Sequence, residues 1–113
     1  MKKFILVYSN SSDAITKCLL ASPLLHKYKI QTISINYLLE NVTVYDQVKE
    51  GVTKLQWTLP NGDIVSNDES TFLINRVTDF SHELFSGFHS DDQEYAAMEF
   101  HAYLTFALFS FKN

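Results

Sequence analysis

The sequence has few of the residues on which several familiar kinds of functional site depend. It contains one cysteine, Cys18, so the chain can form neither an internal disulfide nor a zinc site built from cysteines. It contains three glycines, and none lies in a P-loop or a G-x-G-x-x-G turn, which excludes these two routes to nucleotide binding. We expect Cys18 to be a small buried residue on a helix.

Positive charge is also scarce. The chain has nine lysine and arginine residues and thirteen acids, which gives a net charge of −4. Among the nine cations, only Lys2 and Lys3 are adjacent in the sequence. Nucleic-acid binding depends on clustered cations that displace counterions, so a nucleic-acid partner is excluded. The apolar run at 4–8 is too short for a signal peptide, and no apolar stretch reaches the roughly 18 residues of a membrane span. The sequence therefore predicts a cytoplasmic protein without a membrane partner.

Aromatic residues are abundant. Nine phenylalanines, six tyrosines and one tryptophan stand among 113 residues, of which 46% are hydrophobic. Each buried aromatic side chain removes a large apolar area from water, so a chain of this length can build one substantial core. Two domains would each be too small to do so. We therefore expect residues 1–113 to form a single domain.

The first part of the chain has the pattern of a strand, a helix and a second strand. Residues 4–8 are continuously apolar, as in a strand covered on both faces. Ser12 or Asn10 can cap a helix that starts near Asp13, and residues 30–36 alternate as a second strand does. The predicted helix is expected to carry an apolar face formed by Ala14, Ile15, Cys18 and Leu19. Together these elements predict a right-handed βαβ unit.

The middle of the chain has the pattern of shorter strands. Residues 42–45 are β-prone, and the Asn-Gly pair at 61–62 is a strong hairpin signal, so residues 54–59 are expected to pair with the strand after that turn. Residues 71–77 form a further strand that can return to the main sheet. The predicted fold is α/β, with a small, partly parallel sheet, a β-hairpin and a long C-terminal helix.

The C-terminal helix is predicted most clearly. Ser90 and Gln93 fit a capping box, and acids crowd the first turn. From 95 to 111 the helix is apolar nearly all round, which a lone sheet cannot shield. We expect a second chain or a following domain to cover part of it; alternatively, the helix and the hairpin already enclose it. The candidate interface residues are Tyr95, Phe100, Tyr103, Phe106 and Phe109.

Arg76 is the sole arginine and closes an apolar strand. Functional groups of α/β folds collect at the carboxyl ends of strands, where a guanidinium can bind a carboxylate or phosphate through two hydrogen bonds. An ordinary ion pair with an acid is the alternative. Backbone N–H groups in the loop at 9–12 could hold an anion, although helix capping also explains those residues. The candidate substrate contacts are Arg76, Asn75, Ser11 and Ser12.

No complete catalytic site is found. His82 and His89 are too widely spaced to share a helix turn, so neither is assigned to a metal. No serine lies in a nucleophile elbow. His101 could act as a general base with Glu94 as its neighbour, or it could lie at the edge of the core. No catalytic residue and no metal ligand are therefore assigned.

Several short motifs together resemble a known family. Trp57, Leu59 and Gly62 fit a W-x-L-x-x-G hairpin, and the strand ending in Asn75-Arg76 fits an L-N-R ending, with Ile74 where the pattern prefers leucine. An acidic helix containing Tyr-Ala follows. In this respect residues 50–113 resemble the pre-ATP-grasp domain, the N-terminal domain of ATP-grasp ligases, and the βαβ start resembles it in topology. The motif positions in the helix are Asp91, Tyr95, Ala96, Glu99 and the aromatic residues up to Phe111.

The resemblance implies a function for a larger protein. ATP-grasp ligases join a carboxylate to an amine or a similar nucleophile, with ATP and Mg²⁺ held mainly by later domains, so no cofactor is expected in this chain. The chain would supply packing surface and part of the acceptor-substrate site to a following domain, without being catalytic alone. The alternative is a stand-alone interaction domain that forms a homodimer through its C-terminal helix.

Overall fold

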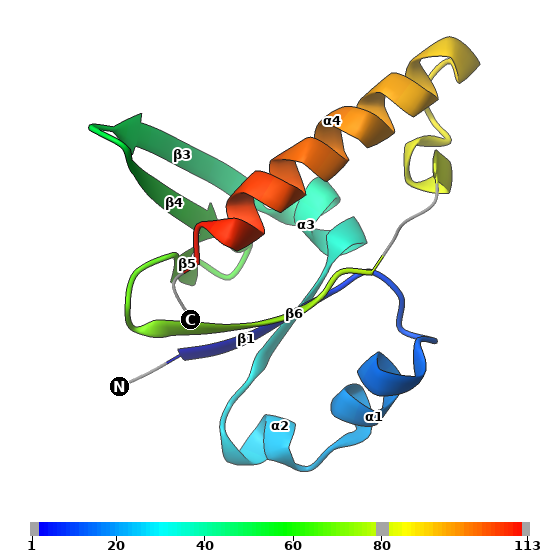
Figure 1. The fold of residues 1–113 in the computed structure, drawn as a ribbon. Helices are drawn as coiled ribbons and strands as arrows, with labels where there is room; N and C mark the ends of the chain where they lie inside the picture. Colours follow the sequence, from blue (N-terminus) through cyan, green and yellow to red (C-terminus); the bar gives the residue numbers. More distant parts are fainter. Residues whose placement is uncertain (1–2, 79–81, 112–113) are drawn as a thin grey trace.

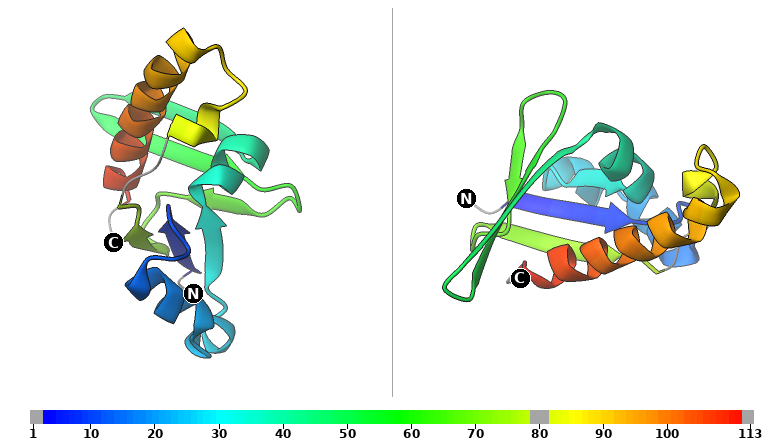
Figure 2. Two further views of the ribbon diagram at one scale, coloured as in Figure 1. Left: turned by 90° about the vertical axis from the view of Figure 1, so that its right-hand side faces the viewer. Right: turned by 90° about the horizontal axis from the view of Figure 1, so that it is seen from above.

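The fold is α/β, as the sequence predicts (Figure 1). The computed structural model describes residues 3–78 and 82–111, with the backbone alone at 82 and 83. Three parallel strands form one sheet, and three antiparallel strands form a second sheet. Two further views show the long helix α4 (Ser90–Phe109) running along the parallel sheet, with the antiparallel strands crossing near its C-terminal end (Figure 2).

The parallel sheet has β1 at its centre. β1 (Lys3–Tyr8) pairs with β2 (Gln31–Ser34) on one side and with β6 (Thr71–Arg76) on the other. The three central residues of β1 are at most 1% exposed, which explains its continuous apolar sequence. The predicted strand–helix–strand start and the return of the later strand to the main sheet are both confirmed.

The helix after β1 is capped by its own acid. α1 (Ala14–Ala21) follows Asp13, whose carboxylate accepts hydrogen bonds from the backbone N–H of Thr16 at 3.1 Å and from its hydroxyl at 3.0 Å. The prediction that Ser12 or Asn10 caps this helix is wrong, because the acid at 13 supplies the cap.

Of the apolar face predicted for α1, only Leu19 is partly buried. Thr16 is completely buried, whereas Ile15 is 55% exposed and Cys18 is exposed. The expectation of a buried cysteine is therefore wrong. Thr16 donates both hydrogen bonds to the carboxylate of Asp13, and the same carboxylate accepts one from Arg76 of β6, so Thr16 lies on the side of α1 that faces the sheet. The short helix α2 (Leu24–Lys27), which follows, has no buried residue.

The second strand is shorter than predicted because a helix begins where it ends. The hydroxyl of Ser34 accepts a hydrogen bond from the backbone N–H of Tyr37 at 3.1 Å, which is the arrangement of a helix N-cap. Helix α3 (Ile35–Asn41) then buries two apolar residues one turn apart. The predicted strand at 30–36 is therefore wrong at its last two positions, and its first residue, Ile30, also lies outside β2.

The antiparallel sheet is built from two hairpins. β4 (Val52–Thr58) lies between β3 (Thr43–Lys49) and β5 (Ile64–Ser66). The turn from β4 to β5 contains Gly62 at φ 91°, whose N–H donates to the carbonyl of Leu59 at 2.9 Å. The hairpin predicted at the Asn-Gly pair is confirmed.

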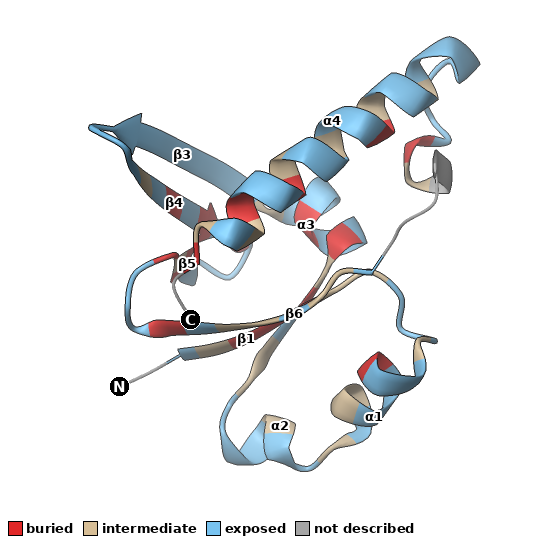
Figure 3. Ribbon diagram, viewed as in Figure 1, coloured by how far each residue is buried: buried red, intermediate tan, exposed pale blue. Residues whose placement is uncertain are grey.

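A second tight turn, which sequence analysis misses, joins β3 to β4. Lys49 pairs with Val52, so only Glu50 and Gly51 form the loop. Both have positive φ, at 54° and 75°, which is the geometry of a type I′ turn and matches the twist of a hairpin. β3 is an edge strand of this sheet, and all of its residues are exposed (Figure 3).

Helix α4 begins one residue earlier than the predicted cap allows. His89 is the N-cap, and its Nδ1 accepts a hydrogen bond from the backbone N–H of Asp91 at 3.3 Å. The assignment of Ser90 as N-cap is therefore wrong by one residue. Acids lie in the first turn as predicted. A single turn of 3₁₀ helix, η1 (His82–Phe85), precedes α4.

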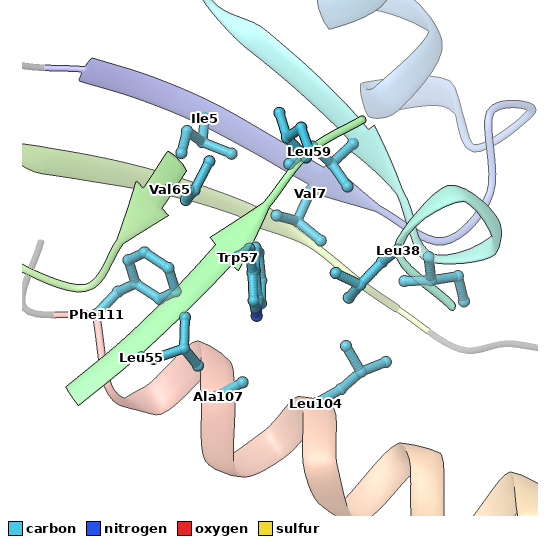
Figure 4. Packing of buried hydrophobic residues seen from close by; sticks show 12 residues of the cluster. Ile5, Val7, Leu38, Leu55, Trp57, Leu59, Val65, Leu104, Ala107 and Phe111 are labelled. Carbon is cyan, nitrogen blue, oxygen red and sulfur yellow. The ribbon is translucent and has the colours of Figure 1, made fainter. Parts of the chain in front are cut away.

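One cluster of buried apolar side chains joins the two sheets to α4 (Figure 4). Trp57 of β4 lies within it, fully buried, with its ring centroid 5.6 Å from that of Phe111. Leu104 and Ala107 reach the cluster from α4, and Val7 reaches it from β1. The core therefore fixes the helix against both sheets and sets the position of the carboxyl edge of the parallel sheet.

Candidate functional site

The carboxyl ends of β1 and β6 meet where the strand order reverses. The chain leaves β1 for β2 on one side, whereas β6 lies on the other side. The backbone N–H of Ser9 donates to the carbonyl of Arg76 at 3.3 Å, and that of Thr78 donates to the Ser9 hydroxyl at 3.0 Å. Open α/β sheets bind ligands in the crevice outside such carboxyl ends. We take this edge as the candidate site.

An ion pair crosses this edge. Nη2 of Arg76 donates to Oδ2 of Asp13 at 2.7 Å, and the same carboxylate oxygen caps α1 through Thr16. The side chains of Arg76 and Asp13 are 25% and 28% exposed, so both remain accessible from solvent. The sequence alone allows Arg76 either an ordinary ion pair or a bound substrate, and the structure shows the ion pair.

The ion pair favours the ionised form of Asp13. The hydrogen bond from Arg76, together with the bonds from Thr16, holds the pKa of Asp13 below its ordinary value. Nε of Arg76 is buried without a hydrogen-bond partner among the described residues. A guanidinium carries five N–H donors, so one contact with Asp13 leaves capacity for a second acceptor such as a carboxylate.

The two serines predicted to bind substrate follow the carboxyl end of β1 in the chain, but their side chains are not part of the contacts that join β1 to β6. Ser11 and Ser12 are exposed, and the backbone N–H of Ser12 donates to Oδ1 of Asn10 at 2.8 Å. The residues that do reach β6 here are Ser9, which belongs to the predicted loop at 9–12, and Asp13, which was expected only as the start of the helix. An acid at the start of a helix beside the sole arginine was the available signal for Asp13.

Asn75 is separated from its neighbour by the sheet. Because successive residues of a strand point to opposite faces, Asn75 faces the α4 side while Arg76 faces α1. Its Oδ1 accepts from the backbone N–H of Val77 at 2.9 Å. Asn75 and Arg76, both predicted to contact substrate, therefore point to opposite faces of the sheet and cannot bind the same group of a ligand.

A small pocket lies on the α4 side, between the end of β6 and the helix. Its volume is about 190 Å³, which is below the roughly 300 Å³ at which pockets enclose a whole ligand. It could hold one side chain or a small group. It is lined by Asn75, Val77, Thr78, His101, Leu104, Thr105, Leu108 and Phe109.

The predicted interface residues of α4 divide into two sets. Tyr95, Phe106 and Phe109 are 66%, 40% and 87% exposed. Phe100 and Tyr103 turn toward the core of their own chain, where Phe100 packs edge-on against Phe85. The expectation that α4 keeps apolar surface exposed is confirmed, and the alternative that its own chain encloses it is wrong.

Within 3–78 and 82–111, excluding the side chains at 82 and 83, no group of three or more His, Cys, Asp or Glu residues could hold a metal ion. Among the helices of the same ranges, none has the length and the apolar character needed to cross a membrane. His89, which sequence analysis weighed as a ligand type, caps α4 instead.

Comparison of the chain with models of protein families, with curated proteins and with solved structures finds no match.

Proposed function

We propose that this chain is the N-terminal domain of an ATP-grasp-type ligase, in which it supplies packing surface and part of the acceptor-substrate site. The observation that carries the proposal is the placement of Arg76 at the carboxyl end of β6, beside β1, where the strand order reverses. An accessible guanidinium at this place suits a ligand with a carboxylate. The motifs at 57–62 and 72–76, which resemble the pre-ATP-grasp pattern, support the same assignment.

Asp13 determines which ligand Arg76 can bind. Because the carboxylate of Asp13 already balances the charge of the guanidinium, a second acceptor is held mainly by directed hydrogen bonds. The ionised Asp13 repels a single carboxylate less than it repels a phosphate with two charges, so a carboxylate suits this requirement better. The acceptor substrate is thus an amine that also bears a carboxylate, as amino acids and peptides do.

The layer of α1 and α2 offers the packing surface. Ile15, Leu24 and Tyr28 are 55%, 50% and 50% exposed, and Phe72 on the same face of the parallel sheet is 40% exposed. The ring of Phe4 bridges Tyr28 and Phe72, at centroid distances of 6.2 Å and 5.8 Å. A large exposed apolar surface of this kind is typical of a contact between domains or proteins.

We assign ATP and Mg²⁺ to a different domain of the proposed enzyme. The chain has no glycine-rich phosphate loop, and its described side chains form no metal-binding group. In the proposed enzyme both are held by another domain, and no residue of this chain is assigned to them.

The first test is the native reading frame after the codon for Asn113. The proposal expects this frame to continue into a region that encodes an ATP-binding domain. The full product should then bind ATP in the presence of Mg²⁺, as measured by titration calorimetry. A stop codon directly after Asn113 would overturn the proposal.

The second test measures the role of Arg76 in the full-length product. Acceptors are sought among free amino acids and short peptides by ATP-dependent phosphate release. Arg76→Gln should raise the KM for the acceptor roughly tenfold or more and leave the KM for ATP unchanged, since one charge-assisted contact contributes about 1.5–3 kcal/mol. Lys54→Gln removes the same charge from an exposed site on β4 and is the matched control. Equal effects of both variants would contradict the assignment.

A further inference from the structure

α4 carries an apolar stripe on the side that points away from the core. Tyr95, Met98, Phe106 and Phe109 are 66%, 64%, 40% and 87% exposed, and Ala102 is exposed between them. Steps of three and four residues keep all five on one side of a helix. We call these five residues the outer face of α4. Figure 3 shows that exposed residues recur along the length of α4.

The outer face has a symmetric spacing. From Tyr95 the steps are three, four, four and three residues, so that Ala102 lies at the midpoint. Two copies of the helix that cross in antiparallel orientation at Ala102 would place Tyr95 against Phe109 of the second copy, and Met98 against Phe106 of the second copy. A two-fold interface requires this relationship, because each residue must meet the same partner in both directions.

We propose that α4 pairs with α4 of a second copy of this chain, in antiparallel orientation about a two-fold axis at Ala102. This inference does not depend on the proposed ligase function. The small side chain at the axis allows the two helices to approach to the 8–10 Å typical of packed helices. Aromatic rings then meet at both ends of the contact, and a thioether meets a ring on each side of the axis.

The charges beside the outer face agree with this orientation. At equal distances from the axis, Glu94 faces Ser110 of the second copy, and Glu99 faces Thr105 of the second copy. No two carboxylates therefore face one another between residues 93 and 111. Antiparallel helices also oppose their dipoles favourably. In a parallel pair each acid would instead lie opposite its own copy, which costs energy.

The apolar area of the outer face is close to the minimum for a weak, reversible dimer. An aromatic side chain presents roughly 150–250 Å², so the three exposed aromatic residues of the outer face offer about 400 Å² per copy. Met98 raises the apolar area buried by two copies to about 1,000 Å², which is near the lower limit for specific interfaces. We therefore expect a dimer with a dissociation constant in the micromolar range.

The oligomeric state of the full-length protein tests this interface. Sedimentation equilibrium between about 1 and 100 µM should show a reversible dimer. Ala102→Glu should raise the dissociation constant at least tenfold, because two carboxylates then meet at the axis. Phe109→Gln is a second variant. Because Phe109 is 87% exposed, this substitution should weaken the dimer without unfolding the chain. Lys54→Gln, on β4, is a control that should leave the dimer unchanged.

A charge pair tests the register. Met98→Glu alone and Phe106→Lys alone should each weaken the dimer, whereas the double variant should recover it at low salt, because the two new charges face each other across the interface. A monomer at 100 µM would overturn the proposal, as would a dimer that Ala102→Glu and Phe109→Gln both leave intact. Failure to recover in the double variant would overturn the antiparallel register.

Discussion

The indole Nε1 of Trp57 donates a hydrogen bond to the phenolic oxygen of Tyr103 across 3.0 Å. This bond joins β4, in the antiparallel sheet, to the middle of α4, and it satisfies the one polar atom of a side chain that is otherwise fully buried. Burial, together with the nearby carboxylate of Asp46, raises the pKa of Tyr103 to about 12, so the phenol stays protonated at every physiological pH.

Tyr103→Phe is expected to lower the free energy of unfolding by about 1–2 kcal/mol, because it leaves the buried indole N–H without a partner while it preserves the ring. Urea denaturation followed by far-UV circular dichroism measures the change. Tyr45→Phe is the matched control, since Tyr45 is 58% exposed on β3 and its hydroxyl loss should change stability by less than about 0.5 kcal/mol. Equal losses in the two variants would contradict the role of the indole bond.

Asn67 is a buried amide that fastens β4 to the end of α4. Its Oδ1 accepts from the backbone N–H of Leu55 at 3.0 Å, and its Nδ2 donates to the carbonyls of Thr53 at 2.9 Å and Ser110 at 3.2 Å. Asn67→Ala should therefore cost about 1–3 kcal/mol of stability, because a buried backbone N–H loses its acceptor. Thermal and urea unfolding measure this loss.

An exposed asparagine provides the comparison for Asn67. Asn36 lies on the surface of α3, where Asn36→Ala should be neutral or slightly stabilising, because alanine has the higher helix propensity. If Asn67→Ala were as mild as Asn36→Ala, the three bonds of the buried amide would contribute nothing to the fold.

The fold follows from the sequence where one local signal dominates. The apolar run of β1, the Asn-Gly turn and the long C-terminal helix are each set by such a signal, and the structure confirms them. α3 was missed because a single N-cap serine, Ser34, ends β2 and starts the helix within one residue. The turn at Glu50 was missed because glutamate rarely adopts positive φ, and pairing of the two flanking strands imposes it here.

The candidate site was predictable in part. The position of Arg76 at the end of a strand follows from the pattern of its strand. Its partner Asp13 lies 63 residues away, and only the pairing of β1 with β6 brings the two together. Met98 was absent from the predicted interface, because a helix that is apolar all round gives no sign of which side faces inward.

The ion pair of Asp13 should make stability depend on pH in the acid range. Its pKa is lowered in the folded chain from the ordinary value of 3.8, chiefly by the hydrogen bond from Arg76, so below that value the unfolded chain binds the proton more readily. The stabilisation from Asp13 is therefore complete above the ordinary pKa and is lost as the pH falls through the lowered, folded value.

Asp13→Asn isolates this contribution, because asparagine still caps α1 but carries no charge for Arg76. The difference in unfolding free energy between the native protein and the variant should stay constant from pH 7 to about 5 and should shrink below about pH 4. Urea unfolding at several pH values measures it, and the other acids act equally in both proteins. A difference that grew toward low pH would contradict the lowered pKa of Asp13.

Two substitutions in the two-residue turn between β3 and β4 are expected to change the stability of the chain in opposite directions. Gly51 adopts φ 75° with no atom within 4 Å of an added Cβ, so Gly51→Ala should cost about 1 kcal/mol through backbone strain alone. Glu50 adopts φ 54°, which asparagine tolerates better, so Glu50→Asn should stabilise the chain by roughly 0.5 kcal/mol. Chemical denaturation of both variants measures the two shifts. Destabilisation by Glu50→Asn would show that the glutamate side chain, and not the backbone conformation, determines the stability of this turn.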